Sequence, residues 1–310
     1  MQKKIVFMGT PNFSVPILKS LHQNGFLISS VYTQPPHKSQ RGQKIKKSPI
    51  HEMAEILNIE CRTPELLKNN QKEFDYLKKL NPDIVIVAAY GQLIQKKFLE
   101  LSKNGFINIH TSILPKWRGA APIQRSIMNL DKETGISIMR ITEKLDTGPV
   151  CNIYKIDIHQ NENSEEISKK LSLLASKKIP FEIKNILEGK AYFIEQNHNK
   201  STYAKKIKKS EGLIDWKESA EKIIGKINGL FPFPGAFFNF NNERYKILKA
   251  EIGSGEGQTG QVINKDFEIA CGTKQSIRII QIQRQGKKPQ KIEEFVLGSQ
   301  IKKGSIIQNA

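Results

Sequence analysis

The chain has 310 residues, 38% of them hydrophobic and 25% charged, a composition that supports about two folded domains and excludes a fully disordered chain. The longest apolar run, Ile84–Tyr90, is far shorter than the ~20 residues of a membrane span, and we expect no signal or transit peptide at the start. Three widely spaced cysteines favour neither a disulfide framework nor a CxxC metal site. We therefore expect a cytoplasmic, soluble, monomeric protein that contacts no membrane.

The formal net charge is +19, and two interpretations of this surplus remain open. Only eight of the 49 basic residues are arginine, so lysine dominates, as it does under the compositional bias of an AT-rich genome. That bias does not fix the sign of the net charge, because it does not forbid glutamate. A surplus of this size also indicates a polyanionic partner, such as a nucleic acid.

The first half of the chain alternates short apolar runs with helical patterns, which is typical of βαβ units and a mostly parallel sheet. Strands are predicted at 4–8, 27–33, 83–88, 106–110, 135–141 and 150–156. Helices are predicted at 15–22, with Ser14 as N-cap, at 49–57, with Ser48 as N-cap, and at 164–187. These elements predict a Rossmann-like α/β domain over residues 1–188.

A polar stretch and a run of lysines predict a linker at 189–205, followed by a smaller domain at 206–310. One helix, 219–230, precedes short β segments at 236–240, 245–252, 260–264, 267–271 and 276–283. About five short strands in this length favour an OB-like β-barrel. The GxGxxG pattern at 255–260 is followed by a strand pattern and no helix, so we interpret it as a turn and not as a dinucleotide site.

Three polar residues are predicted to meet at the carboxyl edge of the sheet. Asn108 and His110 are two positions apart at the end of a strand, so their side chains share one face. Asp146 lies in the loop between two later strands. Ligands of open α/β sheets bind at this edge. A hydrogen-bonded core histidine and an ordinary turn aspartate remain the alternative at this point.

Longer strings of residues resemble the folate-dependent formyltransferase family over nearly the whole chain. The matching strings are Met8–Phe13, Tyr32–Pro35, Ala89–Gly91, Asn108–His110, Ser112–Pro115, Trp117–Arg125, Leu145–Gly148, Tyr203–Ile207 and Ile214–Trp216. The resemblance implies a formyltransferase domain that uses 10-formyl-tetrahydrofolate as co-substrate, with the α-amino group of initiator methionyl-tRNA as acceptor, for translation initiation. It also implies that Ser112, Ile113, Leu114 and Pro115 line the folate site.

This chemistry gives each candidate catalytic residue a role. The Asn108 amide can donate to the oxyanion of the tetrahedral intermediate. His110 can assist proton transfer to the leaving nitrogen, and Asp146 can orient His110 and accept the proton of the attacking ammonium. The reaction needs no metal. The other five histidines have no evident partners and are interpreted as structural or surface residues.

Two basic segments are candidate tRNA-binding surfaces. The stretch 34–47 has no acidic residue, and it is interpreted as a loop without structure of its own that carries Lys38, Arg41, Lys44, Lys46 and Lys47. In the resembling family this insertion enters the acceptor-stem region of tRNA; a merely solvated loop is the alternative. The second segment is the run Lys205, Lys206, Lys208 and Lys209, at the start of a domain that is expected to contact phosphates without regard to sequence.

Two other functions remain open. One is a formyltransferase that acts on a sugar-nucleotide or another small amine with the same three catalytic residues, although a small acceptor would need no basic second domain. The other is a non-enzymatic RNA-binding protein on an inactive α/β domain, against which the intact Asn108, His110 and Asp146 argue.

Overall fold

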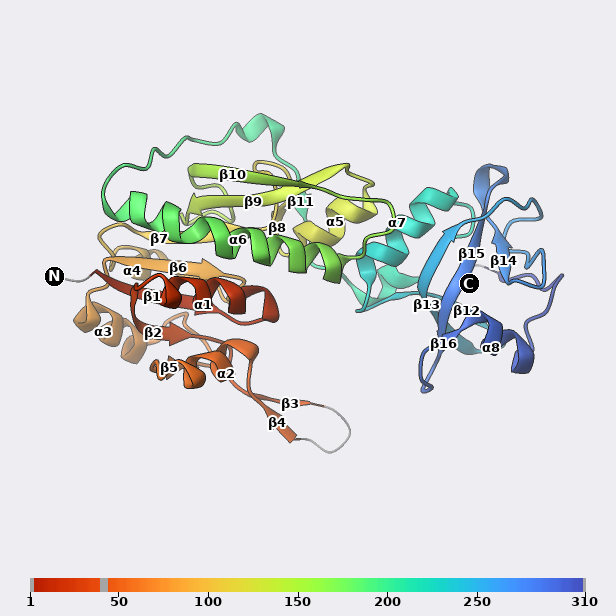
Figure 1. Ribbon diagram of the computed structural model, residues 1–310, viewed down its shortest axis with the longest axis horizontal. Helices are drawn as coiled ribbons and strands as arrows, with labels where there is room; N and C mark the ends of the chain where they lie inside the picture. Colours follow the sequence, from red (N-terminus) through yellow and green to blue (C-terminus); the bar gives the residue numbers. More distant parts are fainter. Residues whose placement is uncertain (1–2, 40–43, 309–310) are drawn as a thin grey trace. The chain divides into compact units, whose positions relative to one another are not determined.

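A computed structural model describes residues 3–39 and 44–308 and is shown in Figure 1. The chain forms two compact units: residues 1–119, 135–156 and 168–203 make the first, and residues 120–134, 157–167 and 204–310 make the second. The chain therefore enters the second unit twice before its C-terminal third. The predicted boundaries, 1–188, 189–205 and 206–310, divide the chain in sequence order and stay a prediction.

The first unit contains a seven-stranded sheet. Its strands are β1 (Lys4–Gly9), β2 (Leu27–Tyr32), β5 (Cys61–Arg62), β6 (Ile84–Ala88), β7 (Phe106–His110), β9 (Glu133–Arg140) and β10 (Val150–Asp157). They are ordered β10-β9-β7-β6-β1-β2-β5. The five from β5 to β7 are parallel, and β9 runs antiparallel to β7. The predicted Rossmann-like, mostly parallel sheet is confirmed.

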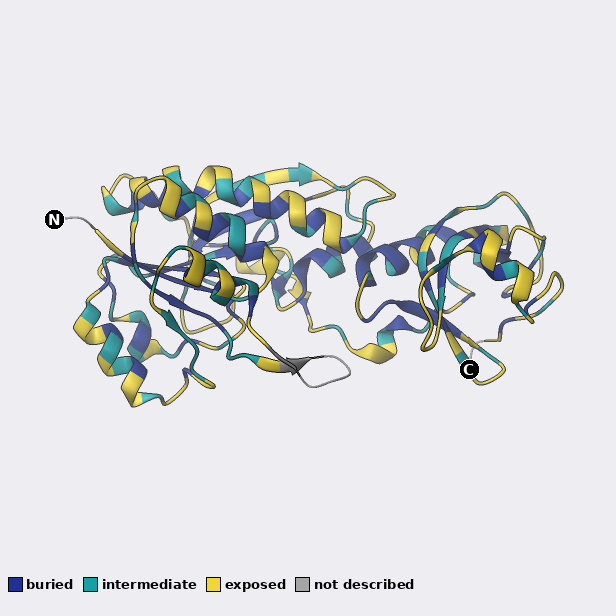
Figure 2. Ribbon diagram, turned by 60° about the horizontal axis from the view of Figure 1, so that its bottom comes forward, coloured by how far each residue is buried: buried dark blue, intermediate teal, exposed yellow. Residues whose placement is uncertain are grey.

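Helices that each bury one side cover the sheet. They are α1 (Val15–Gln23), α2 (Pro49–Ile56), α3 (Gln71–Leu80), α4 (Lys96–Leu99) and α6 (Ser164–Leu187), with 3-10 turns η1 (Asn12–Ser14) and η2 (His198–Lys200). Alternate residues of the central strands, such as Val6 and Val85, pack in one cluster with Leu77 of α3 and Phe98 of α4. Figure 2 shows that the central strands of the sheet are mostly buried, as the residues of β1, β6, β7 and β9 are, whereas β5 and β10 at its edges are largely half-buried or exposed.

The two predicted helix caps have different outcomes. Ser48 caps α2 as predicted, because its hydroxyl accepts a hydrogen bond from the His51 backbone at 3.0 Å. Ser14 occupies the N-cap position of α1, as predicted, but its side chain makes no capping hydrogen bond. Ser14 already has helical backbone angles at the end of η1, and its buried hydroxyl donates to the Ala88 carbonyl at 2.5 Å. A tertiary partner on β6 has replaced the local one.

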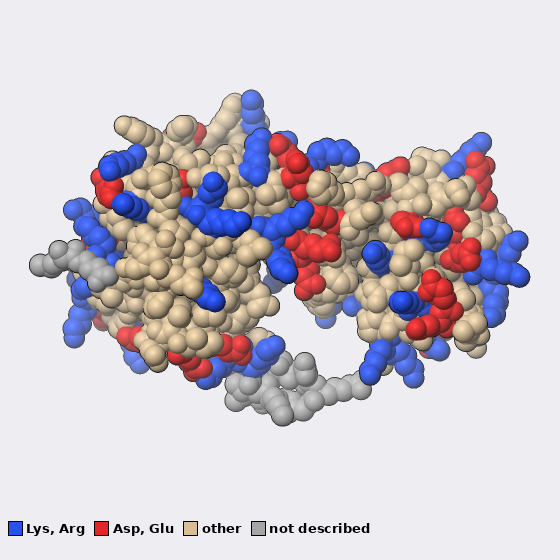
Figure 3. Space-filling model, viewed as in Figure 1, with Lys and Arg blue, Asp and Glu red and all other residues tan. Residues whose placement is uncertain are grey.

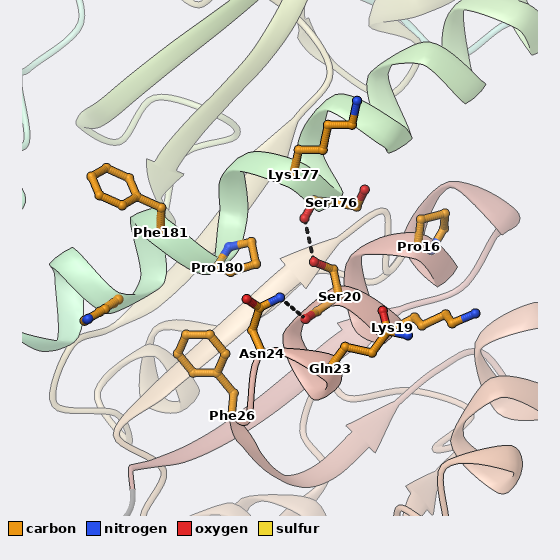
Figure 4. A pocket seen from close by; sticks show the side chains of 11 residues that line it. Pro16, Lys19, Ser20, Gln23, Asn24, Phe26, Ser176, Lys177, Pro180 and Phe181 are labelled. Atoms are coloured by element: carbon orange, nitrogen blue, oxygen red, sulfur yellow. Dashed lines mark hydrogen bonds between the residues drawn. The ribbon is translucent and has the colours of Figure 1, made fainter.

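Helices α1 and α6 lie side by side and border a groove of about 780 Å³, seen in Figure 4. Pro180 lies inside α6 and has no N–H to donate to the carbonyl four residues earlier, that of Ser176. The Ser20 hydroxyl of α1 donates to that carbonyl at 2.6 Å instead. The hydrogen bond therefore joins the two helices at the position where α6 lacks one of its own.

The basic stretch after β2 does form secondary structure, contrary to the prediction of a loop. β3 (His37–Ser39) and β4 (Lys44–Lys46) pair as an antiparallel hairpin. The stretch lacks the alternation of apolar and polar residues from which strands are predicted, so the pattern gave no signal. Residues 40–43 lie outside the described residues.

The second unit combines helices with a small antiparallel sheet. Its elements are α5 (Pro122–Met128), η3 (Lys209–Gly212), α7 (Ala220–Leu230), β12 (Ala236–Phe240), β13 (Glu243–Ile252), β14 (Glu268–Ala270), η4 (Gly272–Lys274), β15 (Ser276–Arg284), β16 (Gln290–Lys291) and α8 (Ile292–Gly298). The sheet order is β12-β13-β15-β14, with β16 on β15. The predicted smaller β domain is confirmed. The predicted strand at 260–264 is wrong, since only the isolated bridges of Gln261 and Val262 form there.

Helix α7 approaches α5 closely through two glycines. A Cβ on Gly225 would lie 2.7 Å from Leu130 Cδ2, and one on Gly229 would lie 2.6 Å from Met128 Cγ. Both distances are shorter than those of real Cβ contacts, so a side chain at either position would force its neighbour to move. At Gly229 a Cβ would also lie 2.9 Å from the Gln124 backbone carbonyl oxygen, which cannot move away as a side chain can. The short two-stranded sheet of β8 (Arg118–Gly119) and β11 (Tyr203–Ala204) completes the fold. No helix in the described part of the chain is long and apolar enough to cross a membrane.

Candidate active site

Asn108 and His110 are carried by β7, whose parallel pairing with β6 places its carboxyl end at the edge where ligands of such sheets bind. His110 is only 5% exposed, and Asn108 is half-buried. The Asn108 side chain makes no hydrogen bond to another residue in 3–39 or 44–308. Its amide group is therefore available to a ligand.

His110 lies between a carbonyl and a carboxylate. Its Nε2 is 2.9 Å from the Trp117 carbonyl oxygen, which only accepts, so Nε2 carries a proton. Its Nδ1 is 3.6 Å from Asp146 Oδ2. The same carboxylate oxygen accepts the backbone N–H of Gly119 at 2.8 Å. Nδ1 is thus the ring atom that can gain or lose a proton beside Asp146. The predicted proximity of His110 and Asp146 is present in the structure.

Two residues of this site have backbone angles that side chains disfavour. Asp146 has φ +50° and Trp117 has φ +59°. Such left-handed residues cost about 1–3 kcal/mol each and persist where the surroundings hold them. The backbone of Asp146 is held by Gln196, whose Nε2 donates to the Asp146 carbonyl at 2.9 Å.

The segment predicted to line the folate site is fixed by β9. Ser137, fully buried on β9, donates to the Ser112 carbonyl at 2.7 Å and accepts from the Leu114 N–H at 3.0 Å. The Ser112 hydroxyl is itself used inside the loop, donating to the Lys116 carbonyl at 2.6 Å. Ser112 and Leu114 are buried, whereas Ile113 and Pro115 are half-buried and are the members of this segment with surface to offer.

A second set of contacts at the same sheet edge was not predicted as part of the site. The Thr10 hydroxyl and the Gln34 amide both donate to the Tyr90 carbonyl, at 2.9 and 3.2 Å. These three residues follow β1, β2 and β6, so they join the carboxyl ends of three neighbouring strands. All three occur in the strings that carry the family resemblance, which was the available signal. Gly91, with φ +85°, turns the chain immediately after Tyr90.

The cysteines are not activated nucleophiles. Burial raises the pKa of the Cys61 thiol to about 11, and burial also raises the pKa values of the Cys151 and Cys271 thiols to about 12. All three are therefore protonated near neutral pH, and covalent thiol catalysis finds no support. No cluster of three or more His, Cys, Asp or Glu side chains able to hold a metal ion occurs within the described ranges.

The predicted tRNA-binding residues lie on two surfaces. On the hairpin, Lys46 is exposed, Lys47 forms an ion pair with Glu55 of α2, and Lys38 and Lys44 are strand residues of β3 and β4. Arg41 lies outside the described residues. In Figure 3 lysine and arginine side chains are spread over the face shown and do not gather in one patch.

The run Lys205, Lys206, Lys208 and Lys209 is exposed and anchored to α5. Arg125 donates from Nε and Nη2 to the Lys205 carbonyl, at 3.1 and 3.0 Å. Its guanidinium also forms a two-bonded ion pair with Glu211, at 2.6 and 3.1 Å. This hydrogen bonding lowers the pKa of Glu211. The backbone of the run is therefore fixed while its ammonium groups face solvent.

Comparisons with known proteins identify the family of the chain. Residues 3–183 match the family described as formyl transferase, and residues 206–300 match the formyl transferase C-terminal domain. The methionyl-tRNA formyltransferase of Pelagibacter ubique (strain HTCC1062) is 66% identical over 309 residues, which is 100% of both chains.

Two solved structures share the fold at lower identity. The sugar 3N-formyl transferase WlaRD, solved with dTDP and 5-N-formyl-THF, has a TM-score of 0.70 and 20% identity, with 93% of this chain and 100% of that chain covered. The methionyl-tRNA formyltransferase of Clostridium thermocellum has a TM-score of 0.56 and 20% identity, with 80% of this chain and 93% of that chain covered.

Proposed function

The chain belongs to the formyl transferase family, and from this premise we propose that it transfers the formyl group of 10-formyl-tetrahydrofolate to the α-amino group of initiator methionyl-tRNA. The family inferred from the sequence motifs is confirmed by the full-length match at 66% identity to a methionyl-tRNA formyltransferase. That relative supports charged tRNA as the acceptor.

The observation that carries the proposed chemistry is a free amide beside a histidine–carboxylate pair. The unprotonated amine attacks the formyl carbon, a new C–N bond forms, and negative charge develops on the formyl oxygen. The Asn108 amide, without a partner in the described structure, supplies the hydrogen-bond donor for that oxygen. Removing such a donor typically costs about 10²–10³ in rate.

His110 and Asp146 handle the proton of this step. The attacking amine must lose a proton, and the departing folate nitrogen must gain one. The Nδ1 atom of His110 faces Asp146 at 3.6 Å, while Nε2 is fixed on the Trp117 carbonyl. The pair can therefore take up a proton at Nδ1 and release it when the bond from the formyl carbon to folate breaks. General acid–base assistance of this kind is typically worth about 10²–10⁴.

We assign folate to the carboxyl edge of the sheet, against the loop at Ser112–Pro115. Ile113 and Pro115 offer the exposed surface of that loop, and Ser137 fixes its shape. The charged tRNA is assigned to the basic strands β3 and β4 and to the lysine run at 205–209. Because phosphate contacts release counterions, tRNA affinity should fall steeply with salt. We place this activity in the cytoplasm and expect a monomer.

The test is a formyl-transfer assay with several acceptors. The protein is incubated with 10-formyl-tetrahydrofolate and one of four acceptors: charged initiator tRNA, uncharged tRNA, free methionine or a dTDP-linked amino sugar. Formylmethionine released from the tRNA is measured by mass spectrometry. We expect transfer to the charged tRNA alone. Transfer to the amino sugar with none to tRNA would replace the proposed acceptor, and transfer to neither would contradict the activity.

A paired experiment tests the tRNA surface in the second unit. Charge reversal of Lys205, Lys206, Lys208 and Lys209 should raise KM for charged tRNA and flatten its salt dependence, with little change in kcat, because phosphates are held equally in the ground and transition states. The matched control reverses four other exposed lysines of this unit: Lys287, Lys288, Lys302 and Lys303. If both charge reversals changed KM equally, the lysine run would not be a specific tRNA contact and would contribute only to the overall positive charge.

A further inference from the structure

The segment between α6 and the second unit's lysine run contacts the candidate active site at several points. In Figure 1 it is the extended stretch that leaves the end of α6 and leads to β11. Ile194 exchanges two backbone hydrogen bonds with Val150, each 2.9 Å long. Thr202 accepts the Trp117 N–H with its hydroxyl and the Arg118 N–H with its carbonyl, both at 2.9 Å. The segment is thus bonded to the start of β10 and to the residues that follow the folate-lining loop after β7.

Gln196 is the buried polar residue of this segment, at 8% exposure. Its Nε2 donates to two carbonyls of the catalytic loop, Asp146 at 2.9 Å and Gly148 at 2.7 Å. Its Oε1 accepts from Nε and Nη2 of Arg118, at 3.0 and 2.6 Å. All four hydrogen-bonding positions of the amide are therefore used. A side chain so completely occupied has one possible orientation.

Arg118 is 2% exposed and fixes that orientation. A guanidinium at this depth is usually paired with a carboxylate. Within the described residues Arg118 forms no ion pair, and its side chain bonds to Gln196 and to His198 Nδ1, the latter at 2.9 Å. Arg118 thus donates two hydrogen bonds to Gln196, the residue that holds the loop of Asp146.

These contacts close a ring around the proposed catalytic pair. His110 bonds to the Trp117 carbonyl, the next residue is Arg118, and Arg118 holds Gln196. Gln196 holds the Asp146 backbone, and the Asp146 carboxylate faces His110 again at 3.6 Å. Asp146 needs such support, because its φ of +50° is unfavourable for an aspartate.

We propose that Gln196, held by Arg118, is a positioning residue that keeps the Asp146 carboxylate at His110 during formyl transfer. This inference rests on the proposed function. Misplacement of a catalytic group by about 1 Å can cost about 10²-fold in rate. Loss of the hydrogen bonds that Gln196 donates should therefore lower kcat without weakening the binding of either substrate.

The test removes the hydrogen bonds donated by the Gln196 amide nitrogen and keeps those accepted by its oxygen. Gln196→Glu keeps two acceptor oxygens for Arg118 but cannot donate to the two carbonyls, so it should fold while kcat falls about 10²-fold. KM for charged tRNA and for the folate should stay within about threefold. Glu195→Ala, at the exposed neighbouring position, is the matched control and should retain the parent kcat. The His110 imidazole resonances in ¹⁵N-histidine spectra should shift in Gln196→Glu and not in the control.

A second variant guards against a folding failure. Arg118→Met combined with Gln196→Met removes the buried guanidinium together with its amide partner, so neither is left unpaired by loss of the other. The Asp146 and Gly148 carbonyls lose their donors, as they do in Gln196→Glu, and thermal unfolding shows whether the variant is folded. It should show the same loss of kcat. A parent-like kcat in either folded variant would overturn the positioning role. Absence of transfer by the parent protein itself would contradict the proposed function instead, so the two failures are distinguishable.

Discussion

Replacing Asp146 by asparagine separates the charge of this residue from its geometry. The asparagine Oδ1 can still accept the Gly119 N–H, which Asp146 Oδ2 accepts at 2.8 Å. The Gln196 hydrogen bond to the Asp146 carbonyl is a backbone contact and is unaffected by the change. We therefore expect the loop to keep its shape, with a free energy of unfolding within about 1 kcal/mol of the parent.

The expected loss of rate comes from the missing charge. Opposite unit charges about 4 Å apart attract by about 4 kcal/mol in partly buried surroundings, and His110 Nδ1 lies 3.6 Å from the Asp146 carboxylate. If this attraction stabilises the protonated ring only in the transition state, its loss corresponds to about a 10³-fold fall in kcat. This figure lies within the range of general acid–base assistance.

The assay is single-turnover formylation of charged tRNA by enzyme in excess, with thermal unfolding measured on the same samples. Single turnover isolates the chemical step from product release. Asp146→Ala, which also removes the acceptor for Gly119, should lose as much rate and additional stability. A rate for Asp146→Asn within threefold of the parent would refute the charge argument, and it would leave Asp146 as a loop-shaping residue.

Three other changes have distinct expected outcomes. Burial by itself would raise the pKa of Glu73, but hydrogen bonds chiefly from Arg62 lower it, so the ionised group stabilises the fold at neutral pH. Glu73→Gln should cost about 1–3 kcal/mol in urea unfolding at pH 7, because Arg62 keeps its ion pair with Glu60, and the difference from the parent should shrink as the pH falls below the usual value of 4.5 and through the folded-state pKa. Ser137→Ala removes both hydrogen bonds that shape the folate loop and should raise KM for the folate while KM for tRNA stays constant; equal changes in both would contradict the assignment of that loop. Gly148→Ala places a methyl group on the Arg140 carbonyl oxygen, so kcat should fall at least tenfold, and a parent-like value would mean that this loop moves freely.

The sequence predicts those elements whose signals are local. Ser48 caps α2 because all the partners of the cap are local: Pro49 begins the helix, and the His51 N–H three residues on donates to the Ser48 hydroxyl. Ser14 has the same side chain before an equally plausible helix, yet its hydroxyl bonds to Ala88, which is 74 residues away. Four of the five parallel strands, β1, β2, β6 and β7, were predicted because their residues form largely apolar runs. The two-residue strand β5, helix α3 and the β3–β4 hairpin were missed because theirs do not.

The candidate site follows the same division. The two-residue period of a strand predicts that Asn108 and His110 share a face, and the sheet edge predicts the approach of Asp146. The role of Gln196 had no such signal. It occurs in a polar stretch that is typical of a linker, and its partners are 48 to 78 residues distant in the chain. Contacts of this range are decided by tertiary structure alone.

The packing of α5 on α7 has a consequence for the newly made chain. Ile123 and Ile127 are buried in α5, and Gly225 and Gly229 let α7 approach it. About 100 residues separate the two helices, so at about 5–20 residues per second α5 is synthesised roughly 5–20 s before α7. Over that interval the apolar side of α5 is exposed in the growing chain. We expect residues 120–134 to be the part of the nascent protein that ribosome-bound chaperones protect.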